Sequence, residues 1–381
     1  MPPTRSATAG SSHRPSWAAW SAFKAGLFQP SLPALLGLVV VLLAWLVGAS
    51  LVVDRDFAMG PGNGHLTNGP TDTYGNLFNE ALDLERRLAV DADPRVLLIG
   101  ASSMRESLAE LGSLQALVGQ AAGPEVTPEL LTAGALSVWE MAALLDPLRA
   151  DLTGIVALEI SPRRLSTSPE KLEELLHAPR FPFDSPWVNE RASEHGIEPP
   201  SRTGVFFLDH MGFFATRPKI LLQVNRPPVE PLRYLTSRWR PPAGAEWDRV
   251  DRSAAGWLQA WPQHADFNLE GYRDLIDDLS TDGRVAVVLI EAPSNPAVDA
   301  RIYAEAPAAE ALADYRRRVR AFADEVGIPY WRPSHDLELP AEAFHDHTHL
   351  REGYARERIT AELGKRLAQH WTVAFPAGGD Q

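Results

Sequence analysis

The chain has 381 residues, a formal net charge of −13 and no cysteine. This length is enough for one large domain or two small ones with a sizeable hydrophobic core. The lack of cysteine excludes disulfides, thiolate catalysis and cysteine-ligated metals. The net negative charge argues against nucleic-acid binding. The longest basic run, Arg316-Arg317-Arg318, does not change this, because it lies in a helical pattern and predicts a solvated helix face.

An uncharged apolar segment runs from Ala34 to Val53. At about 1.5 Å per residue such a helix spans about 30 Å, the thickness of the hydrocarbon core of a bilayer. Basic but no acidic residues precede it and Asp54-Arg55-Asp56 follows, so the positive-inside rule predicts a single-pass plasma-membrane helix with a cytoplasmic N-terminus. A signal peptide cleaved after Val47-Gly48-Ala49, or a buried core helix, remains an alternative.

The chain is expected to divide into four parts. Residues 1–33 form a polar cytoplasmic tail, 34–53 the transmembrane helix, 54–75 a linker rich in Gly, Asn and Pro, and 76–375 one extracytoplasmic domain. Between about 163 and 264 the regular pattern of this domain breaks down into a stretch rich in Pro, Trp and Phe, which predicts an insertion over the active edge.

Strands and helices alternate along the domain. In chain order the hydrophobic periodicity predicts a helix at 76–88, a strand at 95–99, a helix at 104–119, a strand at 129–132, a helix at 137–149, strands at 154–160 and 284–290, a helix at 308–326, a strand at 328–331 and a helix at 352–370. This alternation predicts an α/β fold, a three-layer doubly wound sheet that is mainly parallel. Active residues of such sheets gather at the carboxyl ends of the strands.

Ser102 follows the first strand and opens the next helix, so its hydroxyl is expected at that edge of the sheet. A serine hydroxyl is a weak nucleophile and needs a base within about 3 Å. Near the C-terminus, His349 would be that base, and Asp346 would hold the imidazole in the right tautomer. Two alternatives stay open, that Ser102 only caps its helix and that the neighbouring Ser103 is the nucleophile.

The order of three sequence blocks resembles the SGNH (GDSL-type) hydrolase superfamily, which has a flavodoxin-like sheet. Gly100-Ala101-Ser102 after a strand matches its nucleophile block, and Asp346-His347-Thr348-His349 matches its terminal block. Thr132-Ala133-Gly134-Ala135 looks like the block that supplies an oxyanion-hole glycine, here Gly134. The resemblance covers roughly residues 90–370 by the order of these blocks.

The sequence departs from this family in its third block, usually Gly-x-Asn-Asp, where Leu158-Glu159-Ile160-Ser161-Pro162 stands instead. The resemblance therefore implies backbone oxyanion donors, the N–H groups of Ser102 and Gly134, with the side-chain donor missing or supplied from elsewhere. Together with the anchor, this departure looks like a subgroup that includes the D-alanine-transfer protein of lipoteichoic acid synthesis and the alginate-acetylation proteins. Those proteins work beside membrane-bound O-acyltransferases.

The sequence allows more than one role for Arg105 and for the three histidines of the terminal block. Arg105, one helical turn beyond Ser102, either binds an anionic substrate or lies on the surface. His345, His347 and His349 alternate, and on an extended segment they would share one face as metal ligands. No carboxylate-rich strand end supports that interpretation, so no metal site is expected.

Two further features are more typical of packing than of binding. His210 lies in a loop and is expected to pack there. The tryptophans of the insertion either stack on sugar rings or fill its core; they are Trp239, Trp247, Trp257 and Trp261.

Taken together, the residues and the resemblance predict a membrane-anchored serine esterase or acyltransferase that works through an acyl-serine at Ser102 and needs no cofactor. Its expected substrate is an O-acylated cell-envelope glycan, and its expected partner is a membrane-bound O-acyltransferase. Water as acceptor gives an esterase and a sugar hydroxyl gives a transferase. The competing hypothesis is a non-catalytic partner protein that binds the glycan.

Overall fold

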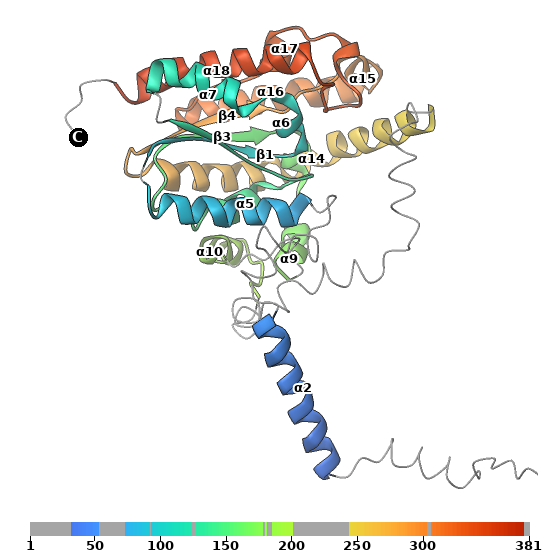
Figure 1. The fold of residues 1–381 in the computed structure, drawn as a ribbon. Coiled ribbons are helices and arrows are strands. Elements are labelled where there is room, and N and C mark those ends of the chain that lie inside the picture. Colours follow the sequence, from blue (N-terminus) through green and yellow to red (C-terminus); the bar gives the residue numbers. More distant parts are fainter. Residues whose placement is uncertain are drawn as a thin grey trace, which may run out of the picture.

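The computed structural model describes most of the chain, namely residues 32–52, 73–91, 93–123, 126–177, 180, 185–200, 244–302 and 306–376. His210 and Trp239 fall outside these ranges, as does most of the predicted linker. The described residues after 73 form an α/β fold built on one sheet (Figure 1).

The sheet has five strands, all parallel, in the spatial order β2-β1-β3-β4-β5. Their bounds are β1 Arg95–Gly100, β2 Thr127–Thr132, β3 Gly154–Ile160, β4 Val285–Glu291 and β5 Tyr330–Trp331. The order reverses at β1, which pairs with β2 on one side and with β3 on the other. Ligands of open parallel sheets bind at this switch point, outside the carboxyl ends of the strands.

Helices cover both faces of the sheet, so its central strands are apolar on both sides. On β1, Leu97 and Ile99 pack under one set of helices, whereas Val96 and Leu98 pack under the other. The first set is α5 Thr73–Leu88, α8 Val138–Leu145, α14 Gly244–Ser280 and α16 Ala306–Val326. The second set is α6 Ser102–Ser107, α7 Leu111–Ala122 and α18 Tyr354–Ala374.

The remaining helices are short or lie before the sheet. They are α2 Leu32–Val52, η1 Arg164–Ser166, α9 Pro169–His177, α10 Pro186–Glu194, α15 Pro296–Ile302, α17 Pro333–Asp336 and η2 Ala341–Ala343. The α/β fold, the parallel sheet and the flanking helices agree with the sequence prediction.

The helix predicted at 104–119 is in fact two helices, α6 and α7, separated by Leu108–Glu110. Leu108 is buried in an extended conformation, and the Ala109 amide donates a hydrogen bond to Thr360 Oγ1 of α18 at 2.9 Å. Tertiary contact with α18 therefore overrides the local helical pattern at this point.

The predicted insertion contains η1, α9, α10 and the first half of α14, a helix of 37 residues. The expected boundary at 264 falls inside α14, which continues into the layer that covers the sheet. Trp261 of this helix is fully buried in the core, and the Tyr272 hydroxyl donates to the Glu159 carbonyl at 2.7 Å. From Trp261 onward, α14 is thus part of the main fold.

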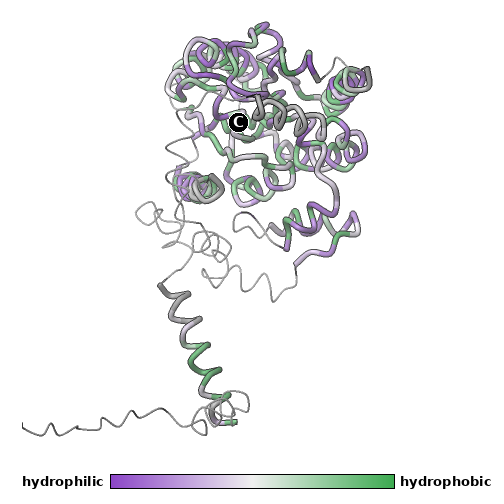
Figure 2. Tube along the Cα trace, turned by 90° about the vertical axis from the view of Figure 1, so that its right-hand side faces the viewer, coloured by the Kyte–Doolittle hydropathy of each residue, from purple (hydrophilic) through white to green (hydrophobic). Residues whose placement is uncertain are grey.

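The predicted membrane segment coincides with helix α2. Among the described residues the exposed large apolar side chains lie in this helix, apart from Val90, Tyr354 and Val373. Figure 2 shows the hydrophobic colouring along its central turns. Counted over the described residues alone, none of the helices is long and apolar enough to cross a membrane.

Candidate active site

The turn from β1 into α6 carries Ser102 at the carboxyl edge of the sheet. Ala101 is extended, with φ −89° and ψ −177°, and Ser102 is the first residue of the helix. Glycine is required at position 100, because a Cβ there would collide with the side chain of Glu159 on the neighbouring strand. The predicted nucleophile block therefore forms a strand–turn–helix, as the sequence suggested.

Ser102, His349 and Asp346 form one hydrogen-bonded chain across 247 residues of sequence. Ser102 Oγ lies 2.8 Å from His349 Nε2, and His349 Nδ1 lies 2.7 Å from Asp346 Oδ2. Because a carboxylate only accepts, Nδ1 carries the hydrogen and Nε2 is left to accept the serine proton. This is the arrangement of nucleophile, base and orienting acid predicted from the sequence.

The loop that carries the acid and the base is held from two sides. The backbone amides of Thr348 and His349 both donate to Asp346 Oδ1 at 2.9 Å, which fixes the carboxylate within its own turn. Asn295, which is 2% exposed, donates from Nδ2 to the Asp346 carbonyl at 3.1 Å, and its backbone amide donates to the His347 carbonyl at 2.8 Å. These hydrogen bonds thus fix the position of Asp346 relative to His349.

The pKa values of the pair shift in opposite directions. Burial alone would raise the pKa of Asp346, but the hydrogen bond and charge of His349, with two backbone amides, lower it to about 2. Burial alone would lower the pKa of His349, but the hydrogen bond and charge of Asp346, with the charges of Glu106 and Glu159, raise it. Asp346 is therefore ionised wherever His349 titrates.

These shifts predict how ester hydrolysis at Ser102, the activity expected from the sequence, would depend on pH. Only neutral His349 accepts the Ser102 proton, so kcat/KM is expected to rise with pH through an apparent pKa above the ordinary value of 6.5. In Asp346→Asn the carboxylate charge is gone, and the midpoint of the rise is expected to move to lower pH. A wild-type profile with its midpoint below 6.5, or an unchanged midpoint in the variant, would contradict this assignment.

Glu159 is a site residue that sequence reasoning missed. Its carboxylate is 1% exposed and accepts from the Ala101 amide at 2.5 Å and from Ser103 Oγ at 2.6 Å. Arg164, 2% exposed, forms an ion pair with it at 3.6 Å. The only signal in the sequence is a lone acid in an apolar strand, at the place where the third family block was sought. Glu159 therefore holds Ala101 and Ser103, the two neighbours of Ser102, by hydrogen bonds.

The loop predicted to supply the oxyanion-hole glycine follows β2. The Ala133 amide donates to the Gly100 carbonyl at 3.3 Å, which places this loop beside the nucleophile turn. Arg180 donates to the carbonyls of Gly134 and Ala135, at 3.3 and 2.9 Å, and pairs with the fully buried Glu140. These contacts hold the loop, while the donor role of the Gly134 amide remains a prediction.

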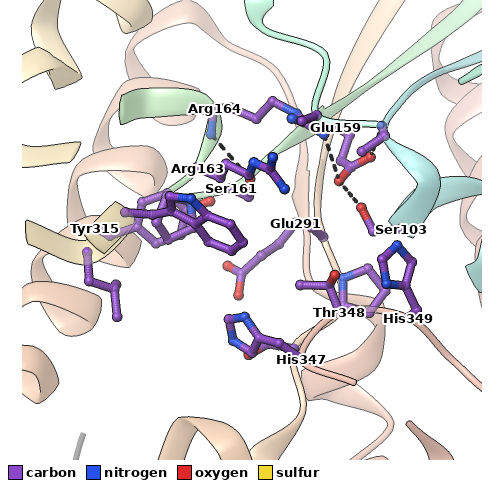
Figure 3. A pocket seen from close by; sticks show the side chains of 18 of the residues that line it. Ser103, Glu159, Ser161, Arg163, Arg164, Glu291, Tyr315, His347, Thr348 and His349 are labelled. Carbon is purple, nitrogen blue, oxygen red and sulfur yellow. Dashed lines mark hydrogen bonds and ion pairs between the residues drawn. The ribbon is translucent and has the colours of Figure 1, made fainter. Parts of the chain in front are cut away.

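One pocket is lined by the turn at Ser102, the loop at residues 347–349 and the carboxyl ends of β3 and β4. In Figure 3, Thr348 and His349 lie on one side of this pocket and Tyr315 on the other, with Glu291 and His347 between them. Glu291, which is 6% exposed, accepts from Arg316 Nη2 at 3.0 Å and from the Tyr330 hydroxyl. The pocket thus combines Ser102 and His349 with a carboxylate, Glu291, whose negative charge is paired with Arg316.

Arg105 does not line this pocket. Its side chain is 43% exposed, with Nη2 3.6 Å from Glu106 Oε1. It borders a separate cavity that Glu80, Glu129 and Thr132 also line. A role for Arg105 in binding substrate at Ser102 has no contact in the structure to support it and remains a prediction.

The three histidines of the terminal block do not share one face, because the chain bends through residues 345–348. The rings of His345 and His349 stack with centroids 5.5 Å apart, and His345 Nε2 lies 3.1 Å from Glu106 Oε2. One ligand atom each from His345, His349 and Glu106 lie within 4.8 Å of one another, a set that could hold a metal ion. His347 instead faces Asp299. A metal there would compete with Ser102 or Asp346 for His349.

The structure shows the surroundings of two of the tryptophans in the predicted insertion, Trp261 and Trp257. Trp261 fills the core, as the packing interpretation expected. Trp257 lies against the pocket, with Arg163 4.5 Å above its ring and His347 stacked at 6.3 Å.

Comparison of the sequence with protein-family models and with curated proteins found no match.

Proposed function

We propose that this protein is an SGNH-like serine esterase or acyltransferase that acts on O-acyl groups of a cell-envelope glycan. The single observation that carries the proposal is the continuous chain from Ser102 Oγ through His349 to Asp346, with separations of 2.8 and 2.7 Å. Residues 247 positions apart in the sequence meet there with the hydrogen-bond pattern that activates a serine hydroxyl.

In the proposed reaction Ser102 Oγ attacks the ester carbonyl while its proton passes to His349 Nε2. The tetrahedral intermediate collapses with cleavage of the ester C–O bond, and His349 returns the proton to the leaving alcohol. The acyl group is then bound to Ser102, and water or a second hydroxyl attacks it by the reverse sequence. Asp346 stabilises the imidazolium that forms in each half.

The oxyanion of each tetrahedral intermediate is proposed to bind to the backbone amides of Ser102 and Gly134. One such donor typically stabilises the transition state by about 3 to 4 kcal/mol. Glu159 and Arg180 support this assignment, because they hold the two segments that carry these amides.

We further propose that α2 anchors the protein in the plasma membrane, with the α/β domain outside the cytoplasm and beside a membrane-bound O-acyltransferase. Support comes from the exposed apolar side chains of α2 and from the basic residues that precede it.

A non-catalytic, glycan-binding partner protein is the alternative. It is favoured by one observation, that the segment replacing Gly-x-Asn-Asp brings a carboxylate, Glu159, to the nucleophile turn rather than a side-chain amide. A carboxylate only accepts hydrogen bonds and cannot stabilise an oxyanion.

The test is to treat the full-length protein in detergent with a fluorophosphonate probe and with p-nitrophenyl acetate. We expect labelling and ester turnover in the wild type, loss of both in Ser102→Ala, and no change on adding a chelator. A folded wild type that neither labels nor turns over ester would contradict the catalytic proposal and favour the binding partner. Loss of turnover with chelator would favour a metal at Glu106, His345 and His349.

A further inference from the structure

Two side-chain pairs connect helix α6 to the loop that carries His349, and the proposed mechanism uses only one of them. Ser102 and Glu106 are four residues apart on α6, so they lie one turn apart on the same side of the helix. Ser102 Oγ lies 2.8 Å from His349 Nε2. Glu106 Oε2 lies 3.1 Å from His345 Nε2. The second pair therefore lies beside the first and has no part in the proposed reaction.

The fold holds the two histidines of these pairs against each other. The His345 amide donates to the His349 carbonyl at 3.0 Å, and an antiparallel bridge joins Phe344 to Leu350 on either side of them. The two imidazole rings stack at 11° with centroids 5.5 Å apart. The side chains of His345, Glu106 and His349 are 46%, 25% and 23% exposed, so a dissolved ion can reach all three.

The three side chains present one ligand atom each within 4.8 Å of one another, and no other such set of His, Asp or Glu occurs among the residues that the structure describes. Two ligand atoms on one tetrahedral zinc ion lie about 3.3 Å apart, because the bonds to zinc are about 2.0 to 2.2 Å long. The separation of Glu106 and His345 is already close to this value. Both side chains are partly exposed, so they can close toward His349 around an ion.

Asp346 supplies the outer partner that such an ion requires. Zinc-binding histidines almost always donate their other ring N–H to a carboxylate, a carbonyl or water. His349 does so already, since its Nδ1 donates to Asp346 Oδ2 at 2.7 Å and its Nε2 keeps a free lone pair. The hydrogen bond that prepares His349 as a base therefore also prepares it as a metal ligand.

We propose that Glu106, His345 and His349 form an inhibitory site for zinc or a similar divalent transition-metal ion. Two imidazoles and one carboxylate are a ligand set that zinc takes in proteins. The bound ion occupies the Nε2 lone pair of His349, which then cannot accept the proton of Ser102. The metal site stands on the geometry alone, whereas the inhibition rests on the proposed function. Removal of the ion restores activity, which is the opposite of what a metallohydrolase shows.

The experiment measures metal binding and ester turnover separately. The full-length protein in detergent is first freed of metal and then dialysed against a series of zinc concentrations, which gives the number of bound ions and the dissociation constant without any need for activity. Hydrolysis of p-nitrophenyl acetate is followed at the same concentrations. We expect turnover to fall as one ion binds, with its midpoint at the dissociation constant from dialysis, and to return when excess EDTA is added.

Two variants each remove one ligand at nearly constant size, Glu106→Gln and His345→Phe. Loss of an outer partner alone typically weakens metal binding by about 10- to 100-fold. Loss of a direct ligand is therefore expected to weaken zinc binding and inhibition by about a hundredfold or more. Inhibition is compared with the turnover of the same variant without zinc, because either change can alter that turnover.

The matched control is His335→Phe, which removes a histidine from an exposed pair with Asp336, 3.6 Å away. It is expected to bind zinc as the wild type does. Equal zinc affinity in the wild type and in both ligand variants overturns the site. Zinc that binds as expected but leaves wild-type turnover unchanged overturns the inhibition.

The two proposals fail in different ways. A wild type without ester turnover overturns the proposed function, and the dialysis of the wild type and its variants still decides whether the metal site exists. Circular dichroism checks the fold of each variant, and the second ligand variant keeps the test decisive if the first does not fold.

Discussion

Replacing Ser102 by alanine is expected to lower ester turnover by a factor on the order of 10⁶, as loss of the nucleophile does where serine and histidine act as a unit. His349→Ala should cost a similar factor, and the double variant should cost little more than either single one. The physical reason is that neither the hydroxyl nor the imidazole reacts productively without the other, 2.8 Å away. Steady-state hydrolysis of p-nitrophenyl acetate measures all three variants.

Ser103→Ala is the matched control. Its hydroxyl lies next in sequence but donates to Glu159 rather than to His349. We expect it to lose about 1 kcal/mol of stability, the typical contribution of one hydrogen bond, while turnover and burst persist. If Ser103→Ala is inactive and Ser102→Ala is not, the assignment of the nucleophile is wrong.

Glu159→Ala is expected to cause the largest loss of stability among site variants, about 3 to 5 kcal/mol, because it leaves Arg164 buried without its partner charge. Both side chains of this ion pair are almost fully buried. The Ala101 amide and the Ser103 hydroxyl lose their acceptor in the same variant. Urea unfolding followed by circular dichroism gives the free energy of unfolding.

Glu159→Gln separates charge from shape, since its amide still offers an oxygen to the Ala101 amide. It should lie between the wild type and Glu159→Ala in stability. The exposed pair Lys171–Glu174 supplies the comparison, because Glu174→Gln is expected to change the free energy of unfolding by less than about 1 kcal/mol. If Glu159→Ala unfolds at the same urea concentration as Glu174→Gln, the bracing role of Glu159 is wrong.

Local signals were enough to predict the sheet and to single out Ser102, Asp346 and His349, which the fold brings into one hydrogen-bonded chain. The apolar runs of β1, β3 and β4 are long and uninterrupted, and a serine directly after β1 has its position fixed by the strand. Asp346 and His349 were predictable because they are three residues apart and contact each other within one turn.

Features that depend on distant partners were not predictable. Glu159 reads as an isolated acid until the fold brings β1 alongside β3. The break between α6 and α7 depends on Thr360, about 250 residues further along the chain. The grouping of the histidines depends on a bend that separates His347 from the other two and turns it toward Asp299.

The central claim is that an acyl group becomes covalently bound to Ser102. The most direct measurement is to mix the full-length protein with p-nitrophenyl acetate, quench it in acid during the burst, and map the tryptic peptide Val96–Arg105 by mass spectrometry with fragmentation. The account predicts one acetyl group on Ser102 in the wild type and none in Ser102→Ala or His349→Ala. Ester turnover without acetylation of this peptide, or acetylation at Ser103, would contradict it.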